Sequence, residues 1–128
     1  MVIDTSVIVA ILLNEPEKVQ FLKKLARTPS RSISSVSYME SGMVLSSYFG
    51  ATAEQVLDEL LFDAGIVTVP VSLTHAKLAL EAFRQYGKGR HPAGLNFGDC
   101  FSYALAKSSA EPLLFKGGDF ARTDISVA

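Results

Sequence analysis

The sequence predicts an α/β domain in which helices cover both faces of a mostly parallel sheet, a three-layer α/β/α arrangement. Short apolar or β-branched runs alternate along the chain with longer amphipathic segments. Parallel strands need crossover connections, which helices normally supply. The 128 residues are also a usual length for one domain, and no stretch resembles a linker. We therefore expect a single domain that spans residues 1–128.

The first half of the chain predicts two strand and helix units. In chain order we expect a strand at 1–3, helices at 7–13 and 17–25, a strand at 31–34 and a helix at 36–49. Asp4-Thr5-Ser6 is typical of a turn or helix cap, and Ser35 or Ser37 could cap the last helix, which Gly50 ends. The amphipathic spacing at 17–25 indicates a helix with one buried face.

The second half continues the alternation. The expected elements are a helix at 52–64, a strand at 66–69, a helix from Ser72 to Tyr86, a loop at 87–97, a helix at 98–107, a strand at 112–115 and an edge strand at 125–127. Thr52 followed by Gln55 indicates a capping box. The glycines and proline of 87–97 indicate a loop.

Composition excludes several classes of protein. A net charge of −1 does not give the broad positive field of a strong duplex-DNA binder. No apolar run approaches the roughly 20 residues that cross a bilayer, and the start lacks signal-peptide features, so we expect a cytoplasmic protein without a membrane partner. One cysteine permits no internal disulfide. The mean hydropathy of +0.27 is high for a small domain and suggests an oligomer or a bound peptide partner.

Acidic residues follow the predicted strands. Asp4 comes directly after the first strand, and Asp119 follows the strand at 112–115 across Gly117-Gly118. Asp99 opens a helix after the glycine-rich loop. Ligands of parallel α/β sheets bind beyond the carboxyl ends of the strands. We therefore expect these three carboxylates to share one rim.

Glu40 is expected to join them from a helix. It would share a helical face with Val36, Met43 and Val44, so the sequence predicts an inward-pointing carboxylate. A buried carboxylate needs a cation or must be protonated. Four acids without cysteine or histidine suit the hard ions Mg²⁺ and Mn²⁺. Such ions activate water and stabilise charge on phosphate, so metal-assisted phosphodiester hydrolysis is the chemistry that fits.

Each acid also has a structural interpretation. Asp4 could simply cap a helix, Asp99 could be a first-turn acid that stabilises the helix dipole, and Asp119 could be a turn residue. Glu40 is the hardest to explain structurally. Four independent placements at one edge favour a shared site.

At these residues the chain resembles a PIN domain, and specifically the VapC-like toxins of bacterial type II toxin–antitoxin systems. The resemblance spans the whole chain and depends on five motifs: MVIDTS at 1–6, YME at 38–40, LNFGDCFSYALA at 95–106, FKGGDF at 115–120 and TDI at 123–125. The motif at 95–106 is the most specific.

The resemblance implies a PIN-like fold and an endoribonuclease that needs Mg²⁺ or Mn²⁺. Asp4, Glu40, Asp99 and Asp119 would be the catalytic and metal-binding quartet. A hydroxyl after the first acid, Ser6 in preference to Thr5, would support the site. The implied partners are RNA, a cognate VapB-like antitoxin that blocks the enzyme, and a second copy of the chain in a homodimer.

Three other functions fit the sequence less well. A phosphatase with an aspartyl nucleophile needs a second aspartate two residues after the first, where Ser6 stands. A receiver-type magnesium-binding signalling domain leaves Glu40 and the loop before Asp99 unexplained. A non-catalytic PIN-like binding module conflicts with the presence of all four acids.

Several further residues are expected to have no catalytic role. Asp124 aligns with an acid often found near the end of the family's chains, but a solvated carboxylate is the simpler interpretation. Lys88, Arg90 and His91 could meet RNA phosphates or form a solvated loop. Cys100 is expected to be a small core residue, because no neighbour activates it. His75 is likewise expected to be structural.

Overall fold

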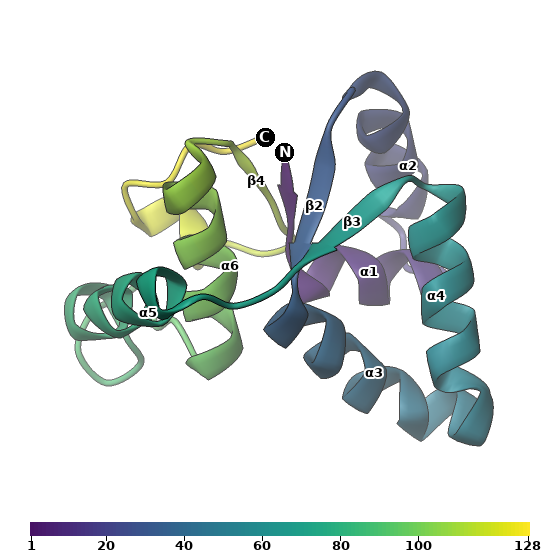
Figure 1. The fold of residues 1–128 in the computed structure, drawn as a ribbon, viewed down its shortest axis with the longest axis horizontal. Helices are drawn as coiled ribbons and strands as arrows, with labels where there is room; N and C mark the ends of the chain where they lie inside the picture. The colour runs from purple at the N-terminus through teal and green to yellow at the C-terminus, as the bar shows by residue number, and fades with distance from the viewer.

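A parallel four-stranded sheet organises the computed structural model, which describes residues 1–128 (Figure 1). The strands are β1 (Val2–Ile3), β2 (Arg31–Ser34), β3 (Ile66–Val69) and β4 (Leu113–Leu114). Their spatial order is β3-β2-β1-β4, and every pair is parallel. The predicted parallel sheet is confirmed.

Helices connect the strands and cover both faces of the sheet. They are α1 (Thr5–Leu12), α2 (Lys18–Arg27), α3 (Ser35–Phe49), α4 (Ala53–Asp63), α5 (Leu73–Tyr86) and α6 (Phe97–Ser109), with the short 3₁₀ helices η1 (Gly50–Thr52) and η2 (Phe120–Arg122). In Figure 1, α5 and α6 lie on one side of the sheet, and α1, α2 and α4 lie on the other. No helix combines the length and the apolar character that crossing a bilayer requires.

Two hydrophobic cores lie on opposite faces of the sheet. Ile3 and Leu114 pack with α1, α2 and α4, whereas Val2 and Leu113 pack with α5 and α6. Successive side chains of a strand point to opposite faces, so two adjacent apolar residues serve both cores. The three-layer α/β/α prediction is confirmed.

Polar side chains cap the N-termini of α1, α3, α5 and α6, and three of these caps help to position the site. Asp4 caps α1 by accepting a hydrogen bond from the Ser6 backbone N–H, and Ser34 caps α3 through Val36 N–H. Asn96 and Asp99 form a reciprocal capping box at α6. These caps follow β1, β2 and the loop before α6, so they bring three helix starts to the carboxyl edge of the sheet.

The predicted capping box at Thr52 is wrong. Thr52 has helical backbone angles, and its hydroxyl donates instead to the Phe49 carbonyl over 2.8 Å. Gln55 donates its side-chain amide to Glu59 over 3.0 Å. Because η1 runs directly into α4, Thr52 lacks the extended backbone that a capping residue adopts.

The predicted edge strand at 125–127 is reduced to one bridge between Leu113 and Val127. Leu113 N–H donates to the Ser126 carbonyl over 2.8 Å, and Ala128 N–H donates to the Leu113 carbonyl over 3.0 Å. A strand of two residues, β4, offers only this much backbone for pairing.

Candidate active site

Asp4 lies at the turn from β1 into α1 and is only 3% exposed. Its Oδ2 accepts hydrogen bonds from the backbone N–H of Ser6 over 3.0 Å and from the Ser6 hydroxyl over 2.6 Å. Its Oδ1 accepts from the Ser102 hydroxyl over 2.6 Å. Three donors therefore satisfy a carboxylate that is almost fully removed from water.

Ser6 supports Asp4, whereas Thr5 does not. The Ser6 Oγ accepts the backbone N–H of Lys116 over 2.9 Å while its own proton goes to Asp4. The Thr5 hydroxyl donates to the Ser37 carbonyl over 3.3 Å instead. Ser6 therefore contacts Asp4 and links this carboxylate to the segment that follows β4.

Asp99 carries the strongest electrostatic signature of the site. Burial raises the pKa of its carboxyl to about 7, the hydrogen bond from Asn96 N–H opposes the rise, and the charges of Asp4, Glu40 and Asp119 raise it further. Asp99 Oδ2 accepts the backbone N–H of Asn96 over 3.0 Å, and the side-chain oxygen of Asn96 accepts the backbone N–H of Asp99 over 2.8 Å. Asp99 is therefore both a helix-capping residue and the point at which the other three charges act.

Glu40 reaches the first turn of α6 from α3. A Cβ added at Gly98 would overlap both carboxylate oxygens of Glu40. The absence of a side chain at residue 98 therefore creates the space that Glu40 occupies, one residue before Asp99.

The predicted surroundings of Glu40 are wrong. Met43 is 64% exposed and Val44 is also exposed, so these residues do not form an inward face. The buried residues of α3 are Ser37, Ser41 and Leu45. Small serines let α3 approach α6 closely, and Glu40 lies half-buried beside that contact.

Asp119 is the most exposed member of the quartet. It precedes η2, makes no side-chain capping hydrogen bond, and follows Gly117, whose φ of +94° favours glycine. Of the three neighbouring acids it has the smallest effect on the pKa of Asp99. No hydrogen bond or ion pair engages its carboxylate.

Three acids from different elements thus act on Asp99, and none of the four has a cationic partner. None of them forms an ion pair, and Lys116 pairs with Glu15 and Glu17. No three of these side chains surround a common point closely enough to form a complete metal site. The set is within electrostatic range, and its donors are all oxygen, which fits a hard divalent cation.

Asp124 lies in a separate cluster. Its oxygens accept from the Tyr103 hydroxyl and the Lys107 ammonium, each over 2.6 Å. The hydrogen bond from Lys107 and then that from Tyr103 lower the pKa of the Asp124 carboxyl. Asp124 is not among the charges that act on Asp99.

The loop before α6 is held by local contacts. The Arg90 guanidinium lies 5.0 Å from the centre of the Phe83 ring, and His91 Nδ1 accepts Ala93 N–H over 3.0 Å. Lys88 N–H donates to the Leu95 carbonyl over 2.9 Å. No contact joins these side chains to the acids.

His75 and Cys100 have structural environments. His75 completes a capping box with Ser72. Burial, and secondarily the charge of Asp99, raises the pKa of the Cys100 thiol to about 11, so it stays protonated at neutral pH.

Two residues of the site escaped sequence reasoning. Ser102 donates to Asp4, and Ser37 contacts Ser102 over 3.0 Å between the two hydroxyl oxygens. The only available signal is a serine three residues after Asp99, within the otherwise apolar and aromatic run 100–106.

Comparisons with known proteins identify the family and the fold. The PIN domain pattern matches residues 1–126. A ribonuclease VapC of Mycolicibacterium smegmatis is 50% identical over 126 residues, which are 98% of this chain and 98% of that protein.

Two solved structures have the same fold. VapC20 of Mycobacterium tuberculosis, a sarcin-ricin loop cleaving toxin, has a TM-score of 0.80 at 16% identity and covers 99% of this chain and 97% of its own. A toxin–antitoxin complex from Klebsiella pneumoniae has a TM-score of 0.74 at 20% identity, with 99% and 95% covered.

Proposed function

This chain belongs to the PIN-domain family, and on that premise we propose that it is a metal-dependent endoribonuclease that acts as the toxin of a type II toxin–antitoxin pair. The full-length likeness to a VapC ribonuclease carries the proposal. The concentration of carboxylate charge around Asp99 supports it, because a nuclease of this kind needs an acidic site for a cation.

The residues that would hold one or two Mg²⁺ or Mn²⁺ ions are Asp4, Glu40, Asp99 and Asp119. When bound, such an ion lowers the pKa of a coordinated water and neutralises charge on the phosphate under attack. The acids of the chain position the ion and do not attack RNA themselves.

The chain's own hydrogen bonds prepare two of these acids. Ser6 and Ser102 hold the Asp4 carboxylate in one orientation, and Asn96 holds Asp99. The pKa of Asp99 is raised to about 7, so its carboxyl is partly protonated at neutral pH, and binding of a cation there would be coupled to loss of that proton. Metal affinity should therefore rise with pH up to about 7.

RNA cleavage tests the proposal. Purified protein should cut single-stranded RNA with Mg²⁺ or Mn²⁺, stop in excess chelator and recover when metal is restored. Asp4→Asn should abolish cutting with an intact fold, whereas the matched Asp124→Asn control should retain it. Full activity in chelator, or in Asp4→Asn, would contradict the mechanism.

A non-catalytic module that only grips an antitoxin is the alternative. It predicts no metal-dependent cutting and equal antitoxin binding by the wild type and Asp4→Asn. The same RNA assay therefore separates the two functions.

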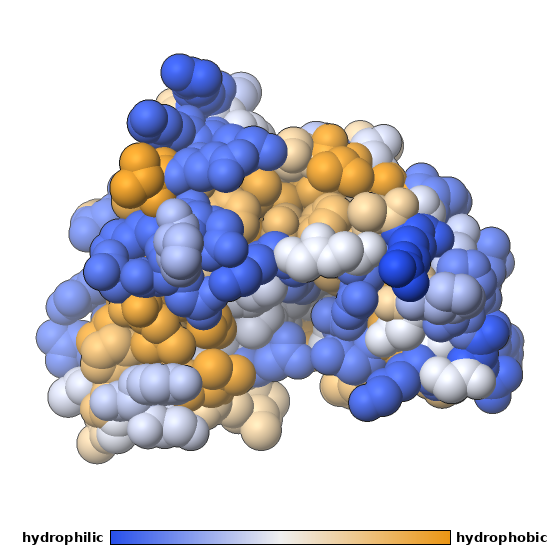
Figure 2. Space-filling view, turned by 180° about the vertical axis from the view of Figure 1, so that it is seen from behind, coloured by the Kyte–Doolittle hydropathy of each residue, from blue (hydrophilic) through white to orange (hydrophobic).

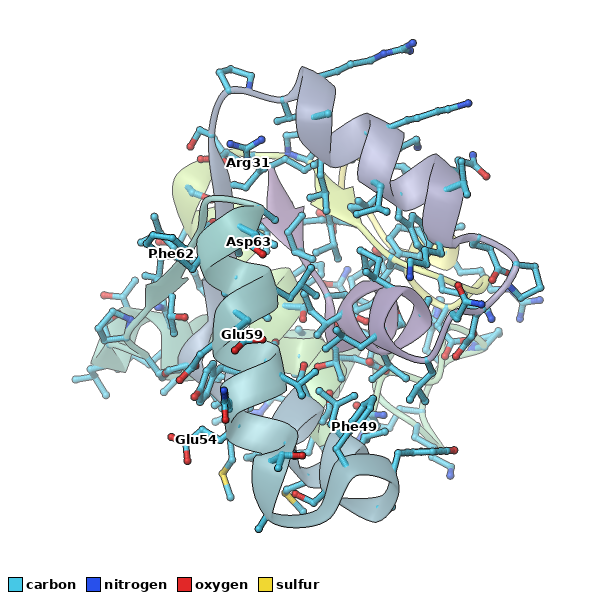
Figure 3. The ribbon with its side chains drawn as sticks, turned by 90° about the vertical axis from the view of Figure 1, so that its right-hand side faces the viewer. Arg31, Phe49, Glu54, Glu59, Phe62 and Asp63 are labelled. Carbon is cyan, nitrogen blue, oxygen red and sulfur yellow. The ribbon has the colours of Figure 1, made fainter.

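We also propose a homodimer and a VapB-like antitoxin as partners. Two groups of exposed apolar side chains support partner surfaces. One lies on α5 and α6 and includes Leu80, Phe83 and Phe97. The other lies on α2 and α4 and includes Leu22 and Phe62, which is 87% exposed and projects from α4 in Figure 3. On the face shown in Figure 2, apolar residues gather in patches between hydrophilic ones.

Sedimentation of Leu80→Asp and Phe62→Asp tests these partners. The wild type should sediment as a dimer and one variant as a monomer. The variant that stays dimeric should lose the antitoxin encoded by a small neighbouring reading frame. A wild type that is monomeric and does not bind this antitoxin would contradict both the homodimer and the antitoxin partner.

A further inference from the structure

Two buried serines connect Asp4 to the interior of the molecule. Ser102 on α6 and Ser37 on α3 are both 0% exposed. The Ser102 hydroxyl donates to Asp4 Oδ1 over 2.6 Å, and the Ser37 and Ser102 hydroxyl oxygens are 3.0 Å apart. A hydroxyl has one proton, and Ser102 gives its proton to Asp4. Ser37 is therefore the donor to Ser102, and the two hydrogen bonds run in one direction toward Asp4.

The second oxygen of Asp4 is fully engaged. Oδ2 accepts both the backbone N–H and the hydroxyl of Ser6. The Ser6 hydroxyl is itself oriented by Lys116 N–H over 2.9 Å. Both lone pairs of Oδ2 are thus used by donors whose directions are fixed.

A count of lone pairs identifies the atom that remains available. A carboxylate offers about four acceptor positions. Ser6 takes two on Oδ2 and Ser102 takes one on Oδ1, which leaves a single position on Oδ1. We propose that Ser102, supported by Ser37, is a positioning residue that fixes the Asp4 carboxylate so that Oδ1 alone is offered to a divalent cation. This inference rests on the proposed metal-dependent function.

The complete burial of Ser102 and Ser37 supports a role for their hydroxyls in orienting Asp4. Alanine would fit both fully buried helical positions, and a buried hydroxyl is tolerated only when it is hydrogen-bonded. Ser41 provides a contrast on the same face of α3. It is equally buried, but its hydroxyl donates to the Ser37 carbonyl of its own helix over 2.7 Å and does not reach Asp4.

Calorimetric titration of Mn²⁺ into metal-free protein tests the proposal without relying on catalysis. Ser102→Ala should stay folded by circular dichroism and bind Mn²⁺ about 10-fold to 100-fold more weakly, as is usual when a residue that orients a metal ligand is lost. Ser37→Ala should lose less affinity, because Ser102 can still donate to Asp4. Ser41→Ala is the matched control and should bind as the wild type does.

The possible results distinguish the positioning role of Ser102 from the proposed metal-dependent function. Wild-type Mn²⁺ affinity in folded Ser102→Ala would overturn the positioning role, while loss of binding in Asp4→Asn would leave the proposed function standing. If Ser102→Ala unfolds, Ser37→Ala decides: weakened binding supports the role and unchanged binding overturns it. A wild type that neither binds Mn²⁺ nor cuts RNA would overturn both proposals.

Discussion

Asp99→Asn should stabilise the metal-free protein although it removes a residue of the proposed site. The pKa of the Asp99 carboxyl is about 7 in the folded protein, against an ordinary value of 3.8. A difference of about 3 units corresponds to roughly 4 kcal/mol if fully expressed. Asp99 is only half-buried, so solvent screening reduces the gain from removing its charge to about 1–2 kcal/mol. For a chain of this length the melting temperature should rise by about 4–7 °C.

The effect of Asp99→Asn should depend on pH. Between about pH 4 and pH 7 the folded wild type binds more protons at Asp99 than the unfolded chain does. The wild-type free energy of unfolding therefore falls as pH rises through this window, and the Asn variant lacks that slope. The difference should be complete at pH 8 and close to zero at pH 4.

Chemical denaturation in excess chelator measures this difference across the pH range. The amide oxygen of Asn can still accept the Asn96 N–H, so the cap of α6 should persist. Added Mn²⁺ should stabilise the wild type and leave the variant unchanged. A variant that is less stable than the wild type at pH 8 would refute the reasoning, because the raised pKa requires the opposite sign.

Two further substitutions test individual residues. Gly98→Ala should displace the flexible end of Glu40 and lower RNA cleavage without loss of stability. Gly42→Ala is the control, because a Cβ at residue 42 meets nothing within 4 Å, and it should leave cleavage unchanged. Equal cleavage by both variants would contradict the position of Glu40. Asp124→Asn should lower the free energy of unfolding by at most about 1 kcal/mol, because its pair with Lys107 is partly exposed, and should leave the cleavage rate unchanged. A loss of cleavage as large as that of Asp4→Asn would place Asp124 in the site.

The sheet could be predicted because strands that are buried on both faces appear in the sequence as short runs of adjacent apolar residues. Val2 and Ile3 are both apolar because they serve cores on opposite faces. The acids at the strand and helix ends were likewise recognisable, since the carboxyl edge of a parallel sheet is known from topology alone.

The surroundings of Glu40 could not be predicted, because helical spacing identifies residues that share a face and does not identify the face that packs. In α3 the buried face carries Ser37 and Ser41, while Met43 is exposed. A hydrophobicity pattern would instead place Met43 on the buried face and the two serines on the exposed face. Ser102 could not be predicted for a different reason: its partner Asp4 is 98 positions away in the sequence.

The cleavage of single-stranded RNA by four single variants tests the central claim most directly. Asp4→Asn, Glu40→Gln, Asp99→Asn and Asp119→Asn should each lose most of the activity seen with Mn²⁺, with folds intact by circular dichroism and Asp124→Asn as the active reference. Any of the four that cuts at the wild-type rate would show that its carboxylate does not belong to a shared cation site.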